Sequence, residues 1–426
     1  MTRVLLISAN RMVHPYVFPL GLGYVHAGLK KYGFHAGVLD LAQILFRKQT
    51  VLKYMNRFHP DYIGISIRNL DNCCYSSPKS TVWEVKQLVG WIYEWQKNAV
   101  VIIGGSAFSL LPEEWMDELK VSYGLMGDGT DTFAQLIMQL EEGCKNPNVP
   151  GLIFWDRDRW VKYPAMKQNA VLKILPSRDI YIHRLQPQLS PAYNILTKTG
   201  CTHQCLFCAY PCLEGHRVTK REPWHVAEEI RMMKEQYQIS AFDFVDSVFN
   251  APSEHAQEIC REIIAKRLNI RFTCFLNPDG CSKQLAVLLK QAGCVHAELG
   301  IDTASVRMLK TLRKGFTKEQ IFQCIQVCRE AGLSYNVCLL FGGPGETMET
   351  VDETLAFLDE AGVEELFGLT GIRILPGTGM YEWYVRENGP VKLLLPQFYC
   401  SKQISPQQVK KLVDSKYKKH GEWMLI

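Results

Sequence analysis

The chain has 426 residues, of which 47% are hydrophobic and 21% are charged, and its formal net charge is +5. This length and composition are typical of two or three globular domains, so disorder and a coiled coil are poor starting hypotheses. The small positive surplus is spread along the chain without a run of five like charges, and we therefore expect no nucleic-acid partner.

The chain shows no feature of a membrane or secreted protein. No apolar stretch approaches the roughly 20 residues that span a bilayer, and polar residues interrupt the N-terminal run MTRVLLISANRM too early for a signal peptide. We therefore expect a cytoplasmic protein without a membrane span. The 15 cysteines are scattered, and only one group of them is closely spaced, which argues against a disulfide framework.

Residues 1–145 alternate short β-branched runs with amphipathic segments. Strands are expected at residues 4–8, 37–40, 62–67, 100–103 and 123–126. Helices are expected between and after them, near residues 20–33, 42–58, 79–97, 112–120 and 130–142. This order predicts a five-stranded, doubly wound α/β domain of the flavodoxin-like (Rossmann) type, whose ligand lies beyond the carboxyl ends of the strands.

The alternation stops over residues 146–190, where NPNVPGLIFWDRDRWVKYPA predicts a hairpin and a polar passage follows, so this segment is expected to be a linker. Residues 191–385 resume the alternation. Six strands are expected there at residues 193–197, 241–246, 271–275, 295–300, 334–340 and 366–374. They predict a partial (β/α)6 barrel with its site at the carboxyl ends. The tail, 386–426, contains one helix that begins at Ser405 and Pro406.

Three closely spaced cysteines, Cys201, Cys205 and Cys208, follow the first predicted barrel strand in a C-x3-C-x2-C pattern. Soft thiolates favour iron, and three of them leave the fourth iron of a 4Fe-4S cluster open. An open iron can chelate the amino and carboxylate groups of S-adenosylmethionine (SAM). Cys212 offers an alternative, because a fourth cysteine would close the cluster into an electron-transfer site. Zinc is a further alternative, but the second cysteine pair that it needs is missing.

With Phe207 before the last cysteine, this loop resembles the radical SAM superfamily, which implies a 4Fe-4S cluster and SAM as cofactors. Later strand ends resemble the same family in order, in the segments Phe244 to Asn250, Gly300-Ile-Asp302-Thr303, Leu340 to Thr347 and Gly371 to Thr378. The third of these segments is similar to the turn that supports adenine and methionine. Asp302 replaces the usual Glu of the family. The resemblance implies cofactor-binding roles for Asp246, Asn250, Asp302, Gly342, Gly343 and Arg373.

Glu298 lies on the predicted fourth barrel strand and alternates with Gly300 and Asp302. The three residues therefore face one side of the strand, which we expect to be the barrel interior. A buried carboxylate needs a partner, and the ribose hydroxyls or the amino group of a cofactor would serve. We accordingly expect Glu298 to bind the cofactor and to act in catalysis.

A flavodoxin-like domain ahead of such a barrel resembles the cobalamin-binding architecture. Matching strand-end loops contain Ser66, Arg68 and Asn69, then Gly104, Gly105 and Ser106, and finally Gly127. Glycines let the backbone approach a bulky ligand, and the two serines would hydrogen-bond its nucleotide tail. One alternative is a nucleotide-binding module, whose G-x-G-x-x-G motif is absent after the first strand. Another is a domain that has lost its cofactor.

Many cobalamin carriers bind cobalt through the histidine of a D-x-H-x-x-G motif, and this chain has no such motif. The family pattern instead suggests that Arg68 faces the corrin, with a catalytic role. A guanidinium has no lone pair to donate to a metal, so it would exclude water without binding cobalt. The alternative for Arg68 is an ion pair with Asp71 in a polar loop.

The resemblance implies methyl transfer from SAM, via methylcobalamin, to an unactivated carbon or phosphorus of a small-molecule or lipid-like substrate. It also implies an external electron donor of the flavodoxin or ferredoxin type. SIRNLDN, LLFGGPGET and the segment from Phe398 to Ser401 favour a methyltransferase-like subgroup. Two alternatives remain: a cobalamin-dependent radical SAM cyclase or rearrangement enzyme without methyl transfer, and an iron–sulfur electron carrier that uses Cys212 as fourth ligand.

Overall fold

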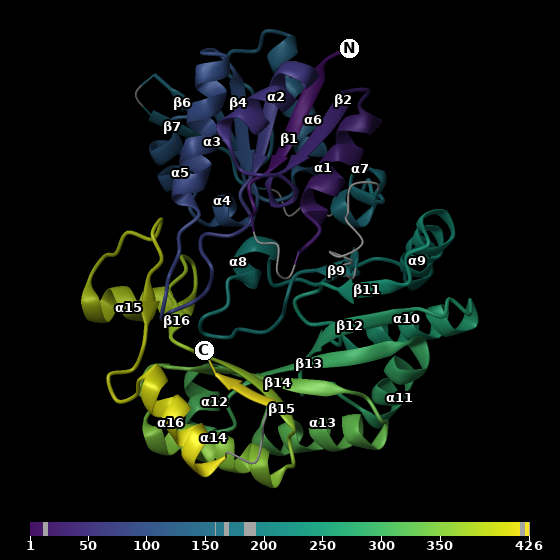
Figure 1. The fold of residues 1–426 in the computed structure, drawn as a ribbon, viewed down its shortest axis with the longest axis vertical. Coiled ribbons are helices and arrows are strands. Elements are labelled where there is room, and N and C mark those ends of the chain that lie inside the picture. Colours follow the sequence, from purple (N-terminus) through teal and green to yellow (C-terminus); the bar gives the residue numbers. More distant parts are fainter. Residues whose placement is uncertain (12–15, 158, 166–169, 183–192, 418–421, 426) are drawn as a thin grey trace. The chain divides into compact units, whose positions relative to one another are not determined.

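The computed structural model describes residues 1–11, 16–157, 159–165, 170–182, 193–417 and 422–425. The chain divides into two compact units, the first made of Met1–Asn72 and Ser80–Pro191 and the second of Cys73–Lys79 and Ala192–Ile426. Each unit is built around its own seven-stranded sheet (Figure 1). The end of the linker that we predicted, with the boundary near residue 190, lies outside the described residues.

The first sheet has the strand order β2-β1-β3-β4-β5-β6-β7. Its strands are β1 Arg3–Ser8, β2 His35–Asp40, β3 Tyr62–Ser66, β4 Val100–Gly104, β5 Tyr123–Leu125, β6 Leu152–Asp156 and β7 Arg159–Lys162. The first five pair in parallel in the order 2-1-3-4-5, which is the flavodoxin-like order. The predicted fold class of this unit is therefore confirmed.

Helices lie between and after these strands. They are α1 Leu20–Lys31, α2 Lys48–Phe58, α3 Val82–Trp95, α4 Ser106–Leu110, α5 Pro112–Leu119, α6 Gly129–Glu141 and α7 Asp179–Ile182, with short 3-10 turns at Leu41–Gln43 and Ala170–Leu172. The helix that we predicted from residue 42 starts only at Lys48. The Asp40 carboxylate accepts a hydrogen bond from the Ala42 backbone N–H and closes a separate turn before it.

The hairpin that we predicted within the linker belongs to the first sheet. Strand β6 pairs antiparallel with β5, and β7 pairs antiparallel with β6. The rings of Trp155 on β6 and Trp160 on β7 pack edge to face, with their centroids 4.4 Å apart. Pairing satisfies the backbone groups of β5, which would otherwise form an open edge, so the unit extends beyond the predicted limit at residue 145.

The second sheet has the strand order β18-β15-β14-β13-β12-β11-β8, and all of its strands run parallel. Its strands are β8 Tyr193–Ile195, β11 Ala241–Phe244, β12 Arg271–Leu276, β13 Cys294–Asp302, β14 Tyr335–Phe341, β15 Glu365–Thr370 and β18 Glu422–Leu425. The six strands from β8 to β15 confirm the predicted partial (β/α)6 barrel. Strand β18 comes from the tail, where we predicted only a helix.

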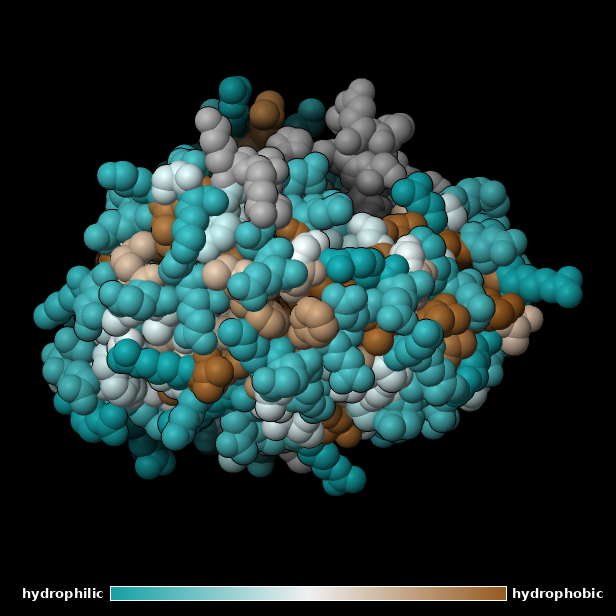
Figure 2. All heavy atoms as spheres, turned by 90° about the horizontal axis from the view of Figure 1, so that it is seen from below, coloured by the Kyte–Doolittle hydropathy of each residue, from teal (hydrophilic) through white to brown (hydrophobic). Residues whose placement is uncertain are grey.

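The helices of the second unit are α8 Tyr210–Glu214, α9 Pro223–Tyr237, α10 Ser253–Ala265, α11 Lys283–Ala292, α12 Val306–Thr311, α13 Lys318–Glu330, α14 Met348–Glu360, α15 Gly379–Asn388 and α16 Pro406–Lys416. Two short ribbons, β9 Lys198–Thr199 with β10 Thr219–Lys220 and β16 Ile372–Arg373 with β17 Phe398–Tyr399, complete it. Figure 1 shows α11, α13 and α14 along one face of the sheet. Figure 2 shows a mostly hydrophilic surface on the side of these helices, with dispersed apolar side chains.

Burial alternates along β13 and distinguishes the two faces of the second sheet. Ala297, Leu299 and Ile301 are fully buried, whereas Glu298 and Asp302 are half-buried. Alternating residues of a strand point to opposite faces. The fully buried set packs toward the helices, so the polar set lies on the other face, which is the barrel interior.

Among the described residues, no helix is both long enough and apolar enough to cross a membrane.

Candidate active site

The loop that carries Cys201, Cys205 and Cys208, here called the cysteine loop, leaves the first barrel strand through a turn that requires glycine. Gly200 has φ +86°, and a Cβ atom on it would lie 2.1 Å from the Arg217 carbonyl oxygen. The Gly200 N–H donates to the Glu214 carboxylate at 2.9 Å, and the Cys201 N–H donates to the Gly215 carbonyl oxygen at 3.0 Å. These bonds fix the direction in which the loop starts, and hence the position of Cys201.

The three predicted cluster cysteines form one electrostatic group. Cys201 is buried, and Cys205 and Cys208 are half-buried. Burial raises the pKa of Cys208 to about 12, and the nearby Cys205 and Cys201 thiols act in the same direction. Burial also raises the pKa of Cys205. Thiols with such pKa values are protonated at neutral pH, so binding of iron releases protons from this loop.

Cys212 lies apart from that group. It is exposed on α8, and its thiol donates to the Gly377 carbonyl oxygen at 3.2 Å. Burial raises its pKa, and the charge that adds to this effect is Glu382, not one of the other three thiols. A cluster ligand would have to share the surroundings of the other ligands. The described contacts therefore favour three ligands over four.

Lys314 is a residue of this site that the sequence patterns did not indicate. Its side chain is only 6% exposed, and its ammonium pairs with the Asp302 carboxylate at 2.6 Å. Burial opposes the charge, but Asp302 and Cys205 outweigh it and raise the pKa of Lys314. The ammonium also lies 5.3 Å from the ring centroid of Phe316. A permanent positive charge therefore stands beside the cysteine loop.

Asp246 and Asn250, which we predicted to bind the cofactor, both have protein partners. The Asp246 carboxylate accepts from the Thr197 N–H at 2.8 Å and the Thr197 hydroxyl at 2.6 Å, and it pairs with the Lys198 ammonium at 3.4 Å. The Asn250 amide exchanges two hydrogen bonds with the Asn277 backbone, each of 2.9 Å. Both side chains brace strand-end loops. Their contact with a cofactor stays a prediction.

Glu298, Gly300 and Asp302 share one face of β13, as predicted. Glu298 is half-buried, and its carboxylate accepts from the Cys338 thiol at 3.8 Å. Burial raises the pKa of Glu298, while the neighbouring His296 lowers it. Asp302 has φ +64° and stands at a register shift in the pairing of β13 with β14. At this irregularity the Asp302 carboxylate pairs with the Lys314 ammonium. The Asp that stands where the resemblance expects a Glu thus has a partner within the protein.

Gly342 and Gly343 form the predicted turn after β14. Gly342 has φ +100°, and both glycine N–H groups donate to one carboxylate oxygen of Glu346. The other oxygen of Glu346 is buried without a hydrogen-bond partner, and burial raises the pKa of Glu346 to about 7. Ser401 in the tail holds the same turn, because its hydroxyl donates to the Glu346 carbonyl oxygen at 2.7 Å.

Arg373 lies beside a segment from an unexpected part of the chain. Its guanidinium contacts the Cys73 sulfur at 3.3 Å. Cys73 begins the segment Cys73–Lys79, which belongs to the second unit although it lies between two elements of the first. The ring of Tyr75 packs against Phe398 with centroids 5.9 Å apart. The cofactor role of Arg373 stays a prediction, and its contact with Cys73 could not be foreseen from the sequence.

In the first unit, the structure brings the predicted cobalamin loops together at the carboxyl ends of β3 and β4. The Ile67 N–H donates to the Gly104 carbonyl oxygen at 2.7 Å, and the Ser106 hydroxyl donates to the Arg68 carbonyl oxygen at 2.9 Å. Gly105 has φ +99°, and a Cβ atom on it would lie 2.5 Å from the Ile67 carbonyl oxygen. Glycine is therefore required where the two loops touch.

The remaining predicted residues of this edge are accessible. Ser66 and Asn69 are half-buried, and Arg68 and Gly127 are exposed. The Gly127 N–H donates to the Ser109 hydroxyl at 3.0 Å, which ties the loop after β5 to α4. The Asn69 carbonyl oxygen accepts from the Thr81 hydroxyl at 2.7 Å.

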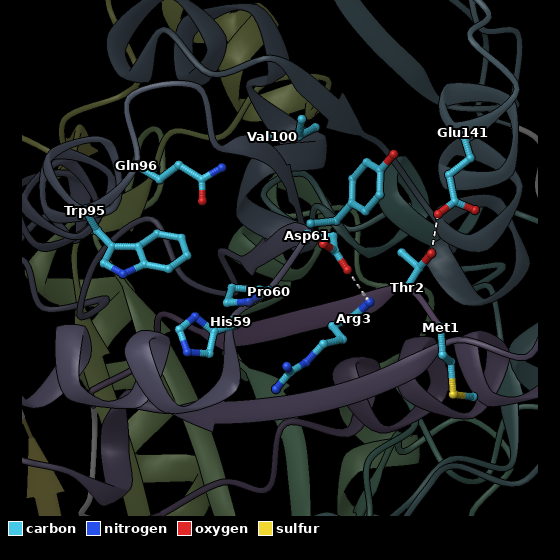
Figure 3. Close-up of a pocket in the computed structure, with 11 residues that line it drawn as sticks. Met1, Thr2, Arg3, His59, Pro60, Asp61, Trp95, Gln96, Val100 and Glu141 are labelled. Carbon is cyan, nitrogen blue, oxygen red and sulfur yellow. Dashed lines mark hydrogen bonds between the residues drawn. The ribbon is translucent and has the colours of Figure 1, made fainter.

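A cavity of about 800 Å³ in the first unit lies elsewhere, at the start of its strands. Its lining includes Arg3, Tyr62 and Val100, the first residues of β1, β3 and β4. Figure 3 shows the Asp61 carboxylate accepting from the Arg3 N–H and the Glu141 carboxylate accepting from the Thr2 hydroxyl. Ligands of doubly wound sheets bind at the opposite, carboxyl ends. This cavity is therefore separate from the predicted cobalamin loops.

The residues present fit the cofactors that the sequence implied. In the cysteine loop, the buried Nε2 atom of His203 has no hydrogen-bond partner. The Oε1 atom of Glu346, after β14, is also buried without a hydrogen-bond partner. A buried polar atom without a hydrogen-bond partner destabilises the folded protein, and a bound ligand would supply the missing hydrogen bond. Three thiols supply soft ligands for iron, and Arg68 and Gly127 in the loops of the first unit are exposed.

Two family models match the chain. The model of the Radical SAM superfamily matches residues 195–358, and that of the B12 binding domain matches residues 9–137. The chain is 26% identical to tryptophan 2-C-methyltransferase from Streptomyces laurentii, over 88% of this chain and 73% of that protein. It is 23% identical to cytidylyl-2-hydroxyethylphosphonate methyltransferase from Streptomyces wedmorensis, over 81% of this chain and 74% of that protein.

A solved structure has the same fold over the whole chain. It is that of the radical SAM methyltransferase TsrM from Kitasatospora setae, with cobalamin and a [4Fe-4S] cluster bound. The TM-score is 0.87 at 24% identity, and the match covers 100% of this chain and 93% of that one. The fold and the order of both units are therefore those of TsrM.

Proposed function

Because the chain belongs to the radical SAM superfamily and carries a B12 binding domain, we propose that it is a cobalamin-dependent methyltransferase. The methyl group comes from SAM, and the acceptor is an unactivated carbon, or a phosphorus, of a small-molecule or lipid-like substrate. Two relatives that are named methyltransferases match 88% and 81% of this chain and 73% and 74% of their own length. A relative named a cyclase matches 79% of this chain but only 55% of its own length, which favours methyl transfer over a cyclisation or rearrangement.

One observation supports the proposal most directly. The thiols of Cys201, Cys205 and Cys208 are close enough to interact electrostatically, whereas the Cys212 thiol donates to the Gly377 carbonyl oxygen. Three ligands leave one iron open for SAM, whereas an electron carrier would use four. The match to the B12 binding domain adds the second cofactor. An iron–sulfur electron carrier needs neither an open iron nor cobalamin, so it is the weaker reading.

The roles of the residues follow from their positions. Cys201, Cys205 and Cys208 would hold the cluster, and the Gly342 turn would support SAM beside it. When bound, the cluster supplies an electron for reductive cleavage of SAM, and cobalamin supplies a carrier for the methyl group. Lys314 holds a positive charge next to Cys205, which favours the thiolate form of this ligand.

Glu298 is the proposed acid–base group. Its carboxylate lies on the interior face of β13, and burial raises its pKa from the ordinary value of a glutamate. A pKa closer to the working pH suits a group that takes a proton from a substrate and returns it. Arg68, exposed at the end of β3, is proposed to exclude water from the cobalt without binding it.

The reaction also needs electrons from outside the protein. An external electron donor of the flavodoxin or ferredoxin type would reduce the cluster, and a cytoplasmic location would suit a donor of this kind.

The decisive experiment is anaerobic reconstitution of the full chain with iron, sulfide and hydroxocobalamin. We expect about four irons per chain and one cobalamin. The Cys205→Ala variant should lose the cluster and all turnover, because one corner ligand is missing. The matched Cys212→Ala variant should keep both. Loss of the cluster in Cys212→Ala would instead support the electron carrier.

Methyl transfer itself is tested with SAM that carries a deuterated methyl group. Acceptors would be indoles, phosphonates and hopanoid lipids. The relatives include tryptophan 2-C-methyltransferase, cytidylyl-2-hydroxyethylphosphonate methyltransferase and a hopanoid C-3 methylase from Methylococcus capsulatus. A product heavier by the labelled methyl group supports the proposal. A cobalamin-dependent loss of substrate without a labelled product would favour a cyclase or rearrangement enzyme.

A further inference from the structure

A second group of cysteines lies in the second unit, outside the cysteine loop. Within the described part of the chain, one group of three potential ligands has all of its ligand atoms within 4.8 Å of one another, and it consists of Cys281, Cys324 and Cys328. The Cys324 and Cys328 thiols are both in hydrogen-bonding contact with that of Cys281. The exposed fractions of the three residues are 6%, 1% and 0%. None of the functions proposed above uses these thiols.

Two elements bring the thiols together. Cys324 and Cys328 are four residues apart on α13 and therefore point from the same face of the helix. Cys281 precedes Ser282, whose hydroxyl accepts from the Leu285 N–H and caps α11. Negative charge next to a helix N-terminus is stabilised by the helix dipole. The site therefore combines a rigid pair of thiols with a third at a position that favours a thiolate.

The position of Cys281 is fixed by the loop that carries it. In this loop, which runs from β12 to α11, the Asn277 and Asp279 carbonyl oxygens both accept from the Asn250 amide, at 2.9 and 3.2 Å. The Lys283 ammonium of α11 pairs with the exposed Glu330 carboxylate of α13 at 2.9 Å. The loop and both helices are thus linked to neighbouring elements, and they hold the three thiols close together.

The spacing fits one metal ion. Sulfur lies about 2.3 Å from zinc, so the sulfur atoms of a tetrahedral site are about 3.8 Å apart. A separation within 4.8 Å is compatible with that value after small side-chain adjustments. The cysteines at 201, 205 and 208 do not form such a compact group, as suits ligands spread around a cluster of several irons.

Buried cysteines are often only small apolar residues of a core. The same unit offers a comparison, because Cys260, Cys274 and Cys294 are also buried there. These three do not bring their sulfur atoms within the same limit. Burial of thiols in this barrel thus does not by itself produce a three-thiol group.

We infer that Cys281, Cys324 and Cys328 bind a single thiophilic metal ion of the zinc class. Binding releases the thiol protons, and a water molecule takes the fourth position of the ion, because the chain supplies three ligands. The ion ties the loop after β12 to α13. That loop includes Asp279, whose charge acts on His203 of the cysteine loop. The metal therefore braces a part of the chain that lies next to the cluster ligands.

The test uses the full-length chain with its iron–sulfur cluster reconstituted anaerobically under reducing conditions. Stoichiometric Zn²⁺ is added, excess is removed on a desalting column, and zinc and iron are counted by mass spectrometry. We expect one zinc per chain in addition to the iron. The double variant C324A/C328A should hold no zinc and keep its iron. The matched control C260A/C294A also removes two buried thiols and should keep both metals.

A second measurement decides the outcome even if C324A/C328A does not fold. The C201A/C205A/C208A variant lacks the cluster and its absorption, so Co²⁺ added to it reports directly on the remaining thiols. A thiolate-to-cobalt charge-transfer band at one equivalent, displaced by Zn²⁺, supports the site. Its absence in folded protein overturns the inference, as does zinc that persists in folded C324A/C328A. Because this variant has no cluster, the result does not depend on the proposed methyl transfer.

Discussion

Lys314 shows how much of the cysteine loop's chemistry depends on a single side chain. It is nearly buried, pairs with Asp302, and interacts with Cys205. The sequence TLRKG around it has no pattern that distinguishes it from a solvated lysine. The three cysteines could be singled out from their spacing together with the matching strand ends downstream, and their role as cluster ligands stays a prediction. The charge beside them could not be predicted, because Lys314 lies 12 residues from Asp302 and more than 100 from Cys205, and the three meet only in the folded chain.

Glu346 is the residue whose protonation most clearly affects stability. Its carboxyl group is fully buried, and burial raises its pKa to about 7. The unfolded chain ionises this group near its ordinary pKa of 4.5. Its contribution to stability is therefore fully present below pH 4.5 and is lost as the pH rises through about 7. The loss approaches about 3 kcal/mol.

We expect Glu346→Gln to remove this dependence, because the amide oxygen can still accept from the Gly342 and Gly343 N–H groups. Melting temperatures of both proteins would be measured from pH 4.5 to pH 8. The melting temperature of the wild type should fall relative to that of the variant as the pH rises over this range. Glu349→Gln, which replaces an exposed carboxylate on α14, is the control and should reproduce the wild-type slope far more closely. Parallel curves for wild type and Glu346→Gln would contradict the assignment.

At the scale of elements, the contact between the loops after β3 and β4 depends on Gly105. A side chain there meets the Ile67 carbonyl oxygen, and φ +99° is itself unfavourable for an L-residue. The strands and their order followed from the alternation of apolar runs and helices. The contact between their loops did not, since a glycine pair in a sequence is compatible with many turns.

We expect Gly105→Ala to destabilise the first unit by at least about 1–2 kcal/mol, from backbone strain and steric overlap. It should also weaken binding of hydroxocobalamin, followed by its visible spectrum. Gly90→Ala is the matched control. Gly90 lies in α3 with no atom within 4 Å of an added Cβ, so the change should be neutral or stabilising by about 0.5–1 kcal/mol. Equal effects of the two variants on cobalamin binding would rule out the role of Gly105.

At the scale of the whole molecule, the second sheet is completed by the far end of the chain. Strand β18 pairs with β15, and its residue Trp423 is 7% exposed and donates to the Val363 carbonyl oxygen at 3.1 Å. The Trp423 ring also stacks on Tyr417 with centroids 5.3 Å apart. The tail is therefore part of the barrel, although its sequence predicted only a helix.

We expect Trp423→Ala to destabilise the protein by about 3–5 kcal/mol, because it leaves a large cavity and exposes the edge of β15. Trp224→Ala is the control, since Trp224 is 56% exposed on α9 and should change stability by no more than about 0.5 kcal/mol. Thermal unfolding of both variants provides the comparison. Similar melting temperatures for the two variants would show that β18 adds little to the barrel.

The sequence by itself determined the two α/β units, their order, and the cysteine loop between a strand and a helix. These features depend on local periodicity and on close spacing, which a sequence displays directly. Only the tertiary structure decided which residues from distant segments meet. It turned Cys212 toward Gly377, placed Lys314 beside Asp302, and added the tail strand to the barrel. Such contacts arise from packing of the whole chain, where partners from 12 to 165 residues apart become neighbours and no local pattern marks them.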